Sequence, residues 1–206
     1  MRDRTKVEMK IILIRHGQTE GNLYKRYIGS TDESLCINGI NKLWDNTRMN
    51  CYPKVQQLYV SPMIRCIETA GIIYPNQKYI TCNELRECDF GEFENKNYLE
   101  LNQNKKYQDW LDSNGTLPFP GGETHEGFKE RCIKGFQHIM NHCSCDEIAL
   151  IVHGGTIMSI LDWYSNPNHE FYHWQIKNGE GYICELSKDK NYITVITKIK
   201  GVGEQL

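Results

Sequence analysis

Residues 11–17 read IILIRHG, an apolar run that ends abruptly in a cation, an imidazole and a glycine. The apolar residues 148–152 repeat this pattern, because His153, Gly154 and Gly155 follow them directly. Short runs that are apolar throughout are typical of strands buried on both faces of a parallel sheet. The two stretches therefore predict central strands that bring polar side chains to one edge of such a sheet.

The rest of the chain alternates short apolar segments with segments of helical length. Strands are expected at residues 7–14, 57–60, 78–81, 148–152, 181–187 and 192–199. Helices are expected at residues 38–49, 62–74, 123–142 and 156–163, with two short ones within 95–113. Asn38 and Ser61 are the expected N-caps of the first two helices. This alternation predicts an α/β fold with three α/β/α layers and a mostly parallel central sheet.

Length and charge exclude several classes of protein. The 206 residues suit one domain, residues 1–206, with a small helical cap inserted at about 91–122. Lys and Arg number 24 against 26 Asp and Glu, so the chain lacks the basic surplus expected of a nucleic-acid-binding protein. No apolar run approaches the ~20 residues of a membrane span, and the charged N-terminus does not resemble a signal peptide. We therefore expect a cytoplasmic location, with the nine cysteines mostly buried as reduced thiols.

The carboxyl ends of parallel strands are where ligands bind in such folds. Arg15, His16 and His153 directly follow predicted strands, and Arg65 lies one helical turn beyond another strand. Two guanidinium groups and two imidazoles around one point form a receptor for a small multivalent anion, of which phosphate is the obvious example. Gly154 would let the anion approach the backbone closely.

A histidine in such a receptor can also react with phosphate. A neutral imidazole nitrogen of His16 could accept a phosphoryl group while Arg15, Arg65 and His153 stabilise its oxygens. The leaving oxygen would then need a proton from a carboxylic acid. The chemistry of the residues alone leaves five candidates for this acid: Glu20, Glu68, Glu84, Glu87 and Asp89.

Four motifs in chain order make this set of residues recognisable. They are RHGxTxxN at 15–22, SPxxRxxET at 61–69, LxExxFGxxE at 85–94 and VHGG at 152–155. Together they resemble the histidine phosphatase superfamily, in its phosphoglycerate-mutase-like branch. The tripeptide RHG alone is weak evidence, whereas four ordered motifs at strand ends and in loops are specific. The resemblance extends from about Lys10 to Ser165.

The resemblance implies a role for each matching residue. It implies that His16 is the nucleophile that becomes phosphohistidine and that Glu87 is the proton donor. The implied phosphate pocket consists of Arg15, Asn22, Arg65, His153 and Gly154. The resemblance also implies that neither a metal nor another cofactor is needed. One departure is that residues 93–95 read FEN where the family often has WEG. Asn tolerates a positive φ, so the turn can survive this change.

A finer resemblance concerns the substrate. Residues 27–35 are similar to the YxGxTDxxL stretch of small phosphatases in this branch, and residues 110–115 and 118–124 look like the α-ribazole phosphatases of cobalamin synthesis. The resemblance implies α-ribazole 5′-phosphate, or its cobamide equivalent, as the substrate. Four aromatic residues of the cap either stack on its flat base or, as the alternative that packing favours, hold the cap on the sheet: Tyr98, Tyr107, Trp110 and Phe119.

Three alternatives stay open. A broad-specificity small-molecule phosphatase would share all these motifs. A phosphoglycerate mutase fits less well, because mutases of this branch carry paired arginines after the glutamate motif and no arginine lies between Glu87 and Glu123. A non-catalytic module would be expected to have lost a central residue. The expected partner is a small phosphate monoester, without nucleic acid or membrane, and the C-terminal hairpin edge could support a homodimer.

Overall fold

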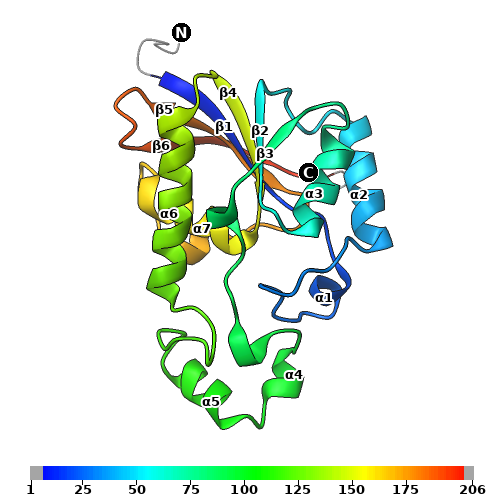
Figure 1. Cartoon of the computed structure of the whole chain (residues 1–206), viewed down its shortest axis with the longest axis vertical. Helices are drawn as coiled ribbons and strands as arrows, with labels where there is room; N and C mark the ends of the chain where they lie inside the picture. The colour runs from blue at the N-terminus through cyan, green and yellow to red at the C-terminus, as the bar shows by residue number, and fades with distance from the viewer. Residues whose placement is uncertain (1–6, 202–206) are drawn as a thin grey trace.

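A computed structural model describes residues 7–201 and has a six-stranded sheet as its middle layer (Figure 1). The strands are β1 (Val7–Arg15), β2 (Gln57–Val60), β3 (Tyr79–Thr81), β4 (Glu147–Val152), β5 (Gly181–Ser187) and β6 (Ile193–Ile199). Their spatial order is β3-β2-β4-β1-β5-β6. The first four strands of this order run parallel, and β5 and β6 are antiparallel to their neighbours. The predicted mostly parallel sheet with a terminal hairpin is confirmed.

Helices cover both faces of the sheet. They are α2 (Ile37–Arg48) and α3 (Ile64–Ile73) on one face, and α6 (His125–His142) and α7 (Gly154–Tyr164) on the other (Figure 1). Alternate side chains of β1 enter the two cores. Ile12 clusters with Leu43 of α2, and Ile11 clusters with Phe136 of α6. All four of these side chains are fully buried, as the apolar run at residues 11–14 requires. The α/β/α prediction is confirmed.

A small helical cap lies beyond the carboxyl ends of the central strands (Figure 1). It contains α4 (Tyr98–Leu101) and α5 (Lys105–Asp112), and the short helix α1 (Glu20–Leu23) lies at the same end of the sheet. Short 3₁₀ helices occur at Asn83–Leu85, Gly91–Phe93 and Phe171–Trp174. The cap has a core of its own, in which Phe93 and Leu101 are almost completely buried. Asn95 has a φ of 55°, as expected for an Asn at this turn.

The first helix of the sheet layers begins differently from the prediction. The N-cap of α2 is Cys36, whose Sγ accepts a hydrogen bond from the backbone N–H of Gly39 at 3.4 Å. Asn38 therefore lies inside the first turn, and its assignment as the N-cap is wrong. The N–H of Cys36 is bonded to the carbonyl of Gln18, and this contact with the first loop sets where α2 starts.

The start of α3 also differs, in a way that matters for the site. The helix begins at Ile64, so Ser61 is not its N-cap. The N–H of Ser61 still donates to Ile151 O in the sheet ladder, and its hydroxyl, which caps no helix N–H, contacts the ring of His153. The N–H of Ile64 donates instead to the carboxylate of Asp32 at 2.8 Å. A side chain distant in sequence thus takes the capping role that the sequence assigned to Ser61.

Within residues 7–201, no helix is both long and apolar enough to cross a membrane. All nine cysteines are unpaired thiols. Six of them are buried, namely Cys36, Cys66, Cys82, Cys88, Cys132 and Cys184.

Candidate active site

His16 follows β1 and is 97% buried, since its exposed fraction is 3%. Its Nδ1 lies 2.7 Å from the carbonyl oxygen of Gly17. Because a carbonyl only accepts hydrogen bonds, Nδ1 carries the proton of the neutral ring and Nε2 carries the lone pair. Burial, and after it the charges of Arg65 and Arg15, hold the pKa of His16 well below its ordinary value of 6.5. The ring is therefore neutral at physiological pH and presents a nucleophilic nitrogen.

His153 is the N-cap residue of α7, and its ring meets that of His16 edge-on at a centroid distance of 5.2 Å. Arg65 Nε donates to its Nδ1 at 3.4 Å, so the proton of the neutral ring is on Nε2 and is donated to Ser61 Oγ at 2.8 Å. Burial and the charge of Arg65 hold the pKa of His153 well below 6.5. Both ring nitrogens therefore have protein partners, and the bond to Ser61 joins the ends of β2 and β4.

The two lowered pKa values lead to a prediction for titration of the protein. In NMR spectra of the free protein, the ring resonances of His16 and His153 should not titrate near 6.5, whereas those of the unfolded chain in urea should. Below that pH the unfolded chain binds protons that the folded chain does not, so the free energy of unfolding should fall as the pH drops. A midpoint near 6.5 for His16 in the folded protein would contradict the assignment of a neutral, buried ring.

Arg65 extends from the first turn of α3 and is completely buried. Its Nη1 and Nη2 donate to the carbonyl oxygens of Thr31 and Gly29, at 2.8 and 2.9 Å. The carboxylate of Glu94 in turn accepts the backbone N–H groups of Gly29, Ser30 and Thr31, at distances of 2.8 to 3.2 Å. Burial opposes ionisation of Glu94, but these bonds and the Thr31 hydroxyl outweigh it and lower its pKa. Glu94 thus holds the loop that positions Arg65.

Replacement of this carboxylate should loosen the loop. In Glu94→Gln, one oxygen becomes an NH₂ group that faces N–H donors, and we expect the free energy of unfolding to fall by about 2–3 kcal/mol. Glu92→Gln is the matched control, because Glu92 is exposed and forms an ion pair with Lys106 on the surface. Urea unfolding measures both variants. Equal stability of the two would show that Glu94 does not hold the loop.

Arg15 is the last residue of β1, and its side chain lines a pocket together with Glu87 and Gly154. Its Nη1 donates to the carbonyl of Ile176 at 2.7 Å. Its Nε is one of the buried nitrogens in the described residues that have no hydrogen-bond partner. A Cβ on Gly154 would lie 3.4 Å from this Nε, so Gly154 places the N-terminus of α7 directly beside Arg15. An anion here would satisfy Arg15 Nε and also meet the positive end of the helix dipole.

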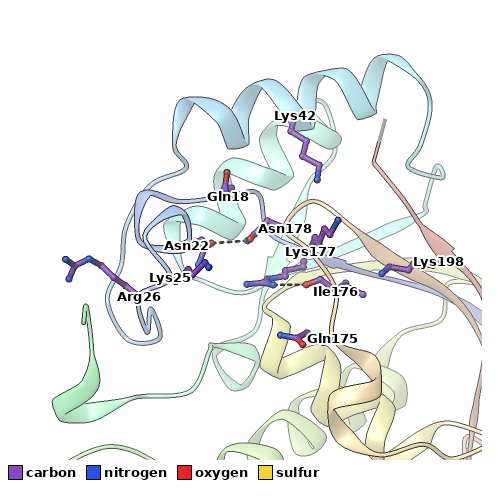
Figure 2. A pocket seen from close by; sticks show the side chains of 11 residues that line it. Gln18, Asn22, Lys25, Arg26, Lys42, Gln175, Ile176, Lys177, Asn178 and Lys198 are labelled. Carbon is purple, nitrogen blue, oxygen red and sulfur yellow. Dashed lines mark hydrogen bonds between the residues drawn. The ribbon is translucent and has the colours of Figure 1, made fainter. Parts of the chain in front are cut away.

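Asn22 lies in α1, and its side chain forms a capping box with Thr19. Its Oδ1 also accepts a hydrogen bond from Asn178 Nδ2 at 2.9 Å, as Figure 2 shows. The same Nδ2 lies 3.2 Å from the carbonyl oxygen of His16. Asn178 therefore ties the loop before β5 to the backbone of His16 and to Asn22. Asn178 is not recognisable from the sequence, because an Asn-Gly pair before a strand is typical of a turn.

Glu87 is partly buried and lines the same pocket as Arg15. Its carboxylate accepts the backbone N–H of Cys88 at 3.0 Å and that of Gly155, in the first turn of α7, at 3.2 Å. Desolvation raises the pKa of Glu87, although these bonds and the charges of Arg65 and Arg15 oppose the rise. A raised pKa favours the protonated form that a general acid requires.

The other candidate carboxylates are placed elsewhere. Glu68 accepts the backbone N–H of Leu35 at 2.7 Å, and Asp89 accepts that of Gly91 at 2.9 Å. Glu84 lies beside the thiol of Cys82, and Glu20 is exposed in α1. Of the five candidates, Glu87 is the one that lines a pocket together with Arg15 and Gly154.

This pocket has a volume of about 350 Å³ and is largely aromatic. Its aromatic lining includes Tyr27, Phe90, Trp110, Phe119, Phe171 and Tyr172. Trp110 Nε1 is a second buried nitrogen without a partner among the described residues. Of the four cap aromatics that could stack on a base, Trp110 and Phe119 line this pocket. Tyr107 is buried in the core of the cap and Tyr98 is exposed, and neither of them lines the pocket.

Residues 11–198 match the model of the histidine phosphatase superfamily, branch 1. The chain belongs to this superfamily. It is an enzyme of the phosphatase class, as expected from the four motifs. The described geometry brings the motif residues His16, Arg65, His153 and Glu87 to one edge of the sheet.

Relatives of this histidine phosphatase carry different names. A candidate phosphoserine phosphatase of Hydrogenobacter thermophilus is 28% identical over 191 residues, which cover 91% of this chain and 93% of the relative. The adenosylcobalamin/alpha-ribazole phosphatase of Salmonella typhimurium is 22% identical over 178 residues, covering 83% and 87%. The crystal structure of the alpha-ribazole phosphatase from Shigella flexneri superposes with a TM-score of 0.80 at 19% identity, covering 93% and 96%. This last likeness shows that the fold is shared.

Proposed function

We propose that this histidine phosphatase hydrolyses small phosphate monoesters without a metal, through a phosphohistidine on His16. The observation that carries the proposal is the state of His16, a neutral buried ring whose Nδ1 proton is held by Gly17. Arg15 and Arg65 supply positive charge beside it. We further propose that residues 1–206 form a single domain with the cap at about 91–122.

The proposed reaction has two steps. His16 Nε2 attacks the phosphorus atom, the ester P–O bond breaks, and Glu87 gives its proton to the leaving oxygen. Water then attacks the phosphohistidine while the Glu87 carboxylate takes one of its protons, and inorganic phosphate leaves with Nε2 restored. Arg15, Arg65 and the N-terminus of α7 at Gly154 stabilise the charge on the transferring group.

Asn22 and His153 each have a group that can donate a hydrogen bond to the phosphate. The Oδ1 of Asn22 is held by Asn178, which leaves its amide NH₂ as the group that can donate to phosphate. His153 holds Arg65 and Ser61, and a phosphate oxygen beside its ring would compete with Ser61 for the Nε2 proton. We propose both residues as ligands of the phosphate group.

For the substrate we propose α-ribazole 5′-phosphate, which carries a flat aromatic base. The aromatic lining of the pocket beside Glu87 supports this choice, because flat bases stack on such side chains. The name of the Salmonella typhimurium relative agrees with it. A broad-specificity phosphatase is the second candidate, and the phosphoserine name of another relative at higher identity favours it.

The test is phosphate release, measured in EDTA, from a panel of monoesters that includes α-ribazole 5′-phosphate, phosphoserine, sugar phosphates and 3-phosphoglycerate. A clear preference for α-ribazole 5′-phosphate by kcat/KM supports the proposed substrate, and a flat profile supports the broad-specificity enzyme. Loss of activity in EDTA would contradict the metal-independent reaction. Interconversion of 2- and 3-phosphoglycerate would identify a mutase.

A substitution of Trp110 tests whether the aromatic base of the substrate stacks in the aromatic pocket. In Trp110→Ala, the ratio of kcat/KM for α-ribazole 5′-phosphate to that for glycerol 3-phosphate should fall by about 10-fold, since base–aromatic stacking contributes ~1–3 kcal/mol. The ratio cancels any loss of folded protein. Trp44→Ala on the exposed side of α2 is the control. An unchanged ratio would contradict stacking on Trp110.

A cytoplasmic location and a homodimer formed through the C-terminal hairpin remain predictions from the sequence.

A further inference from the structure

A second cleft, of about 680 Å³, adjoins the aromatic pocket and shares Arg15, Arg26 and Gln175 with it. Figure 2 shows this basic cleft, which lies between α1, α2, the loop before β5 and the strand β6. Six cationic side chains line it: Arg15, Lys25, Arg26, Lys42, Lys177 and Lys198. Among the residues that the structure describes, no Asp or Glu belongs to the lining.

The charge of the basic cleft differs from that of the whole chain, whose formal charge is −2. Two carboxylates outside the lining form ion pairs with it, because Glu180 lies 3.1 Å from Lys198 and Glu100 lies 3.1 Å from Arg26. The remaining polar lining consists of amide side chains, including Asn22 and Gln175. A concave surface lined by cations and amides concentrates small anions.

The basic cleft and the aromatic pocket are lined by different members of the proposed phosphate-binding set, apart from Arg15. Glu87 and Gly154 line the aromatic pocket, whereas Asn22 lines the basic cleft and Arg15 lines both. Because Glu87 protonates the leaving oxygen in the proposed reaction, the leaving group departs into the aromatic pocket. The basic cleft is therefore not needed to hold the organic part of a monophosphate substrate.

We propose that the basic cleft binds a second phosphate group, distinct from the one that His16 attacks. Lysine ammonium groups and amide N–H groups are suitable donors to phosphate oxygens, and the volume is in the range of sites for small ligands. Either a free anion such as inorganic phosphate or pyrophosphate, or a substrate with two phosphates, supplies this group. This second site goes beyond the proposed function, because an anion can bind in the basic cleft whether or not His16 hydrolyses a monoester.

Calorimetric titration with pyrophosphate tests the site directly. The wild-type protein should show two classes of site, and Lys25→Asn/Lys177→Gln should bind at one of them at least ~10-fold more weakly. Both lysines are exposed, and Asn tolerates the positive φ of 55° at residue 25, so folding is preserved and thermal unfolding verifies it.

Lys54→Gln/Lys134→Gln is the charge-matched control, because both of these lysines are exposed and neither lines the cleft. It should retain both classes of site. A single class in the wild-type protein, or two classes that Lys25→Asn/Lys177→Gln leaves unchanged, would overturn the proposal. The titration gives this answer even if the protein hydrolyses no monoester, so the two proposals fail separately.

Steady-state kinetics distinguish the two sources of the phosphate group. If the substrate carries it, Lys25→Asn/Lys177→Gln should raise KM for ribose 1,5-bisphosphate about 10-fold more than KM for ribose 5-phosphate. If a free anion carries it, pyrophosphate should inhibit the wild-type enzyme with a non-competitive component that this variant loses. Purely competitive inhibition together with equal changes in both KM values would count against the second site.

Discussion

His16→Ala should lower kcat for any phosphate monoester by at least about 10⁴-fold while the protein stays folded. The magnitude follows from the loss of the attacking atom, since removal of a nucleophile leaves only the positioning and charge stabilisation of the site. The structure gives no other group with the same geometry, because both nitrogens of the neighbouring His153 already have partners in the described residues. Phosphate release under single-turnover conditions measures the loss.

The control for this variant is His138→Ala, because His138 is exposed on α6, away from the pocket. It should retain wild-type kcat. Thermal unfolding of His16→Ala, and of His16→Gln in case the cavity destabilises the core, shows whether each variant is folded. Turnover by folded His16→Ala at more than a few per cent of the wild-type rate would remove His16 from the reaction.

Glu87→Gln should lower kcat by about 10²–10⁴-fold for alkyl phosphates, the range that general acid–base catalysis provides. The loss should be much smaller for p-nitrophenyl phosphate, because a good leaving group needs no proton. Gln is close to Glu in size and can still contact the N–H of Cys88 or Gly155, so the fold should persist. An equal loss for both kinds of substrate would give Glu87 a structural role.

The pH profile gives an independent check on Glu87. A general acid must be protonated in the free enzyme, so kcat/KM should fall as the pH rises above the raised pKa of Glu87. The Glu87→Gln variant cannot lose this proton, and its profile should lack that alkaline limb. Retention of the limb would assign it to another group.

The central strands and the histidines that follow them could be predicted, because the apolar runs that identify them are continuous in the sequence. The apolar runs of β1 and β4 have side chains that alternate between two buried faces, and each run ends at a histidine. Since parallel strands end at one edge, the sequence also predicts that His16 and His153 meet, and their ring centroids are 5.2 Å apart.

The supporting contacts could not be predicted in this way, because they join residues that are distant in the chain. Asp32 caps α3, Glu94 holds the backbone of residues 29–31, and Asn178 bonds to Asn22. Asp32 and Glu94 occur in the quoted motifs and Asn178 does not, but in no case does the local sequence indicate which distant group the side chain contacts. The incorrect N-cap at Ser61 has the same cause, since the partner of its hydroxyl is His153.

The proposed general acid could be chosen from the sequence only through the resemblance. Five carboxylates were compatible with the residue chemistry, and the resemblance singled out Glu87. Glu87 lines the pocket, whereas Glu68 is engaged by the backbone of Leu35, a difference that spacing does not encode.

The central claim is that His16 carries the phosphoryl group during turnover. The most direct measurement mixes the enzyme with excess substrate, quenches it in alkali within one turnover, and locates the phosphoryl group by mass spectrometry of the peptides. The account predicts an acid-labile phosphohistidine on the peptide that contains His16, which disappears as phosphate is released. Phosphate release at the full rate with no phosphorylated His16 at any time point would contradict it.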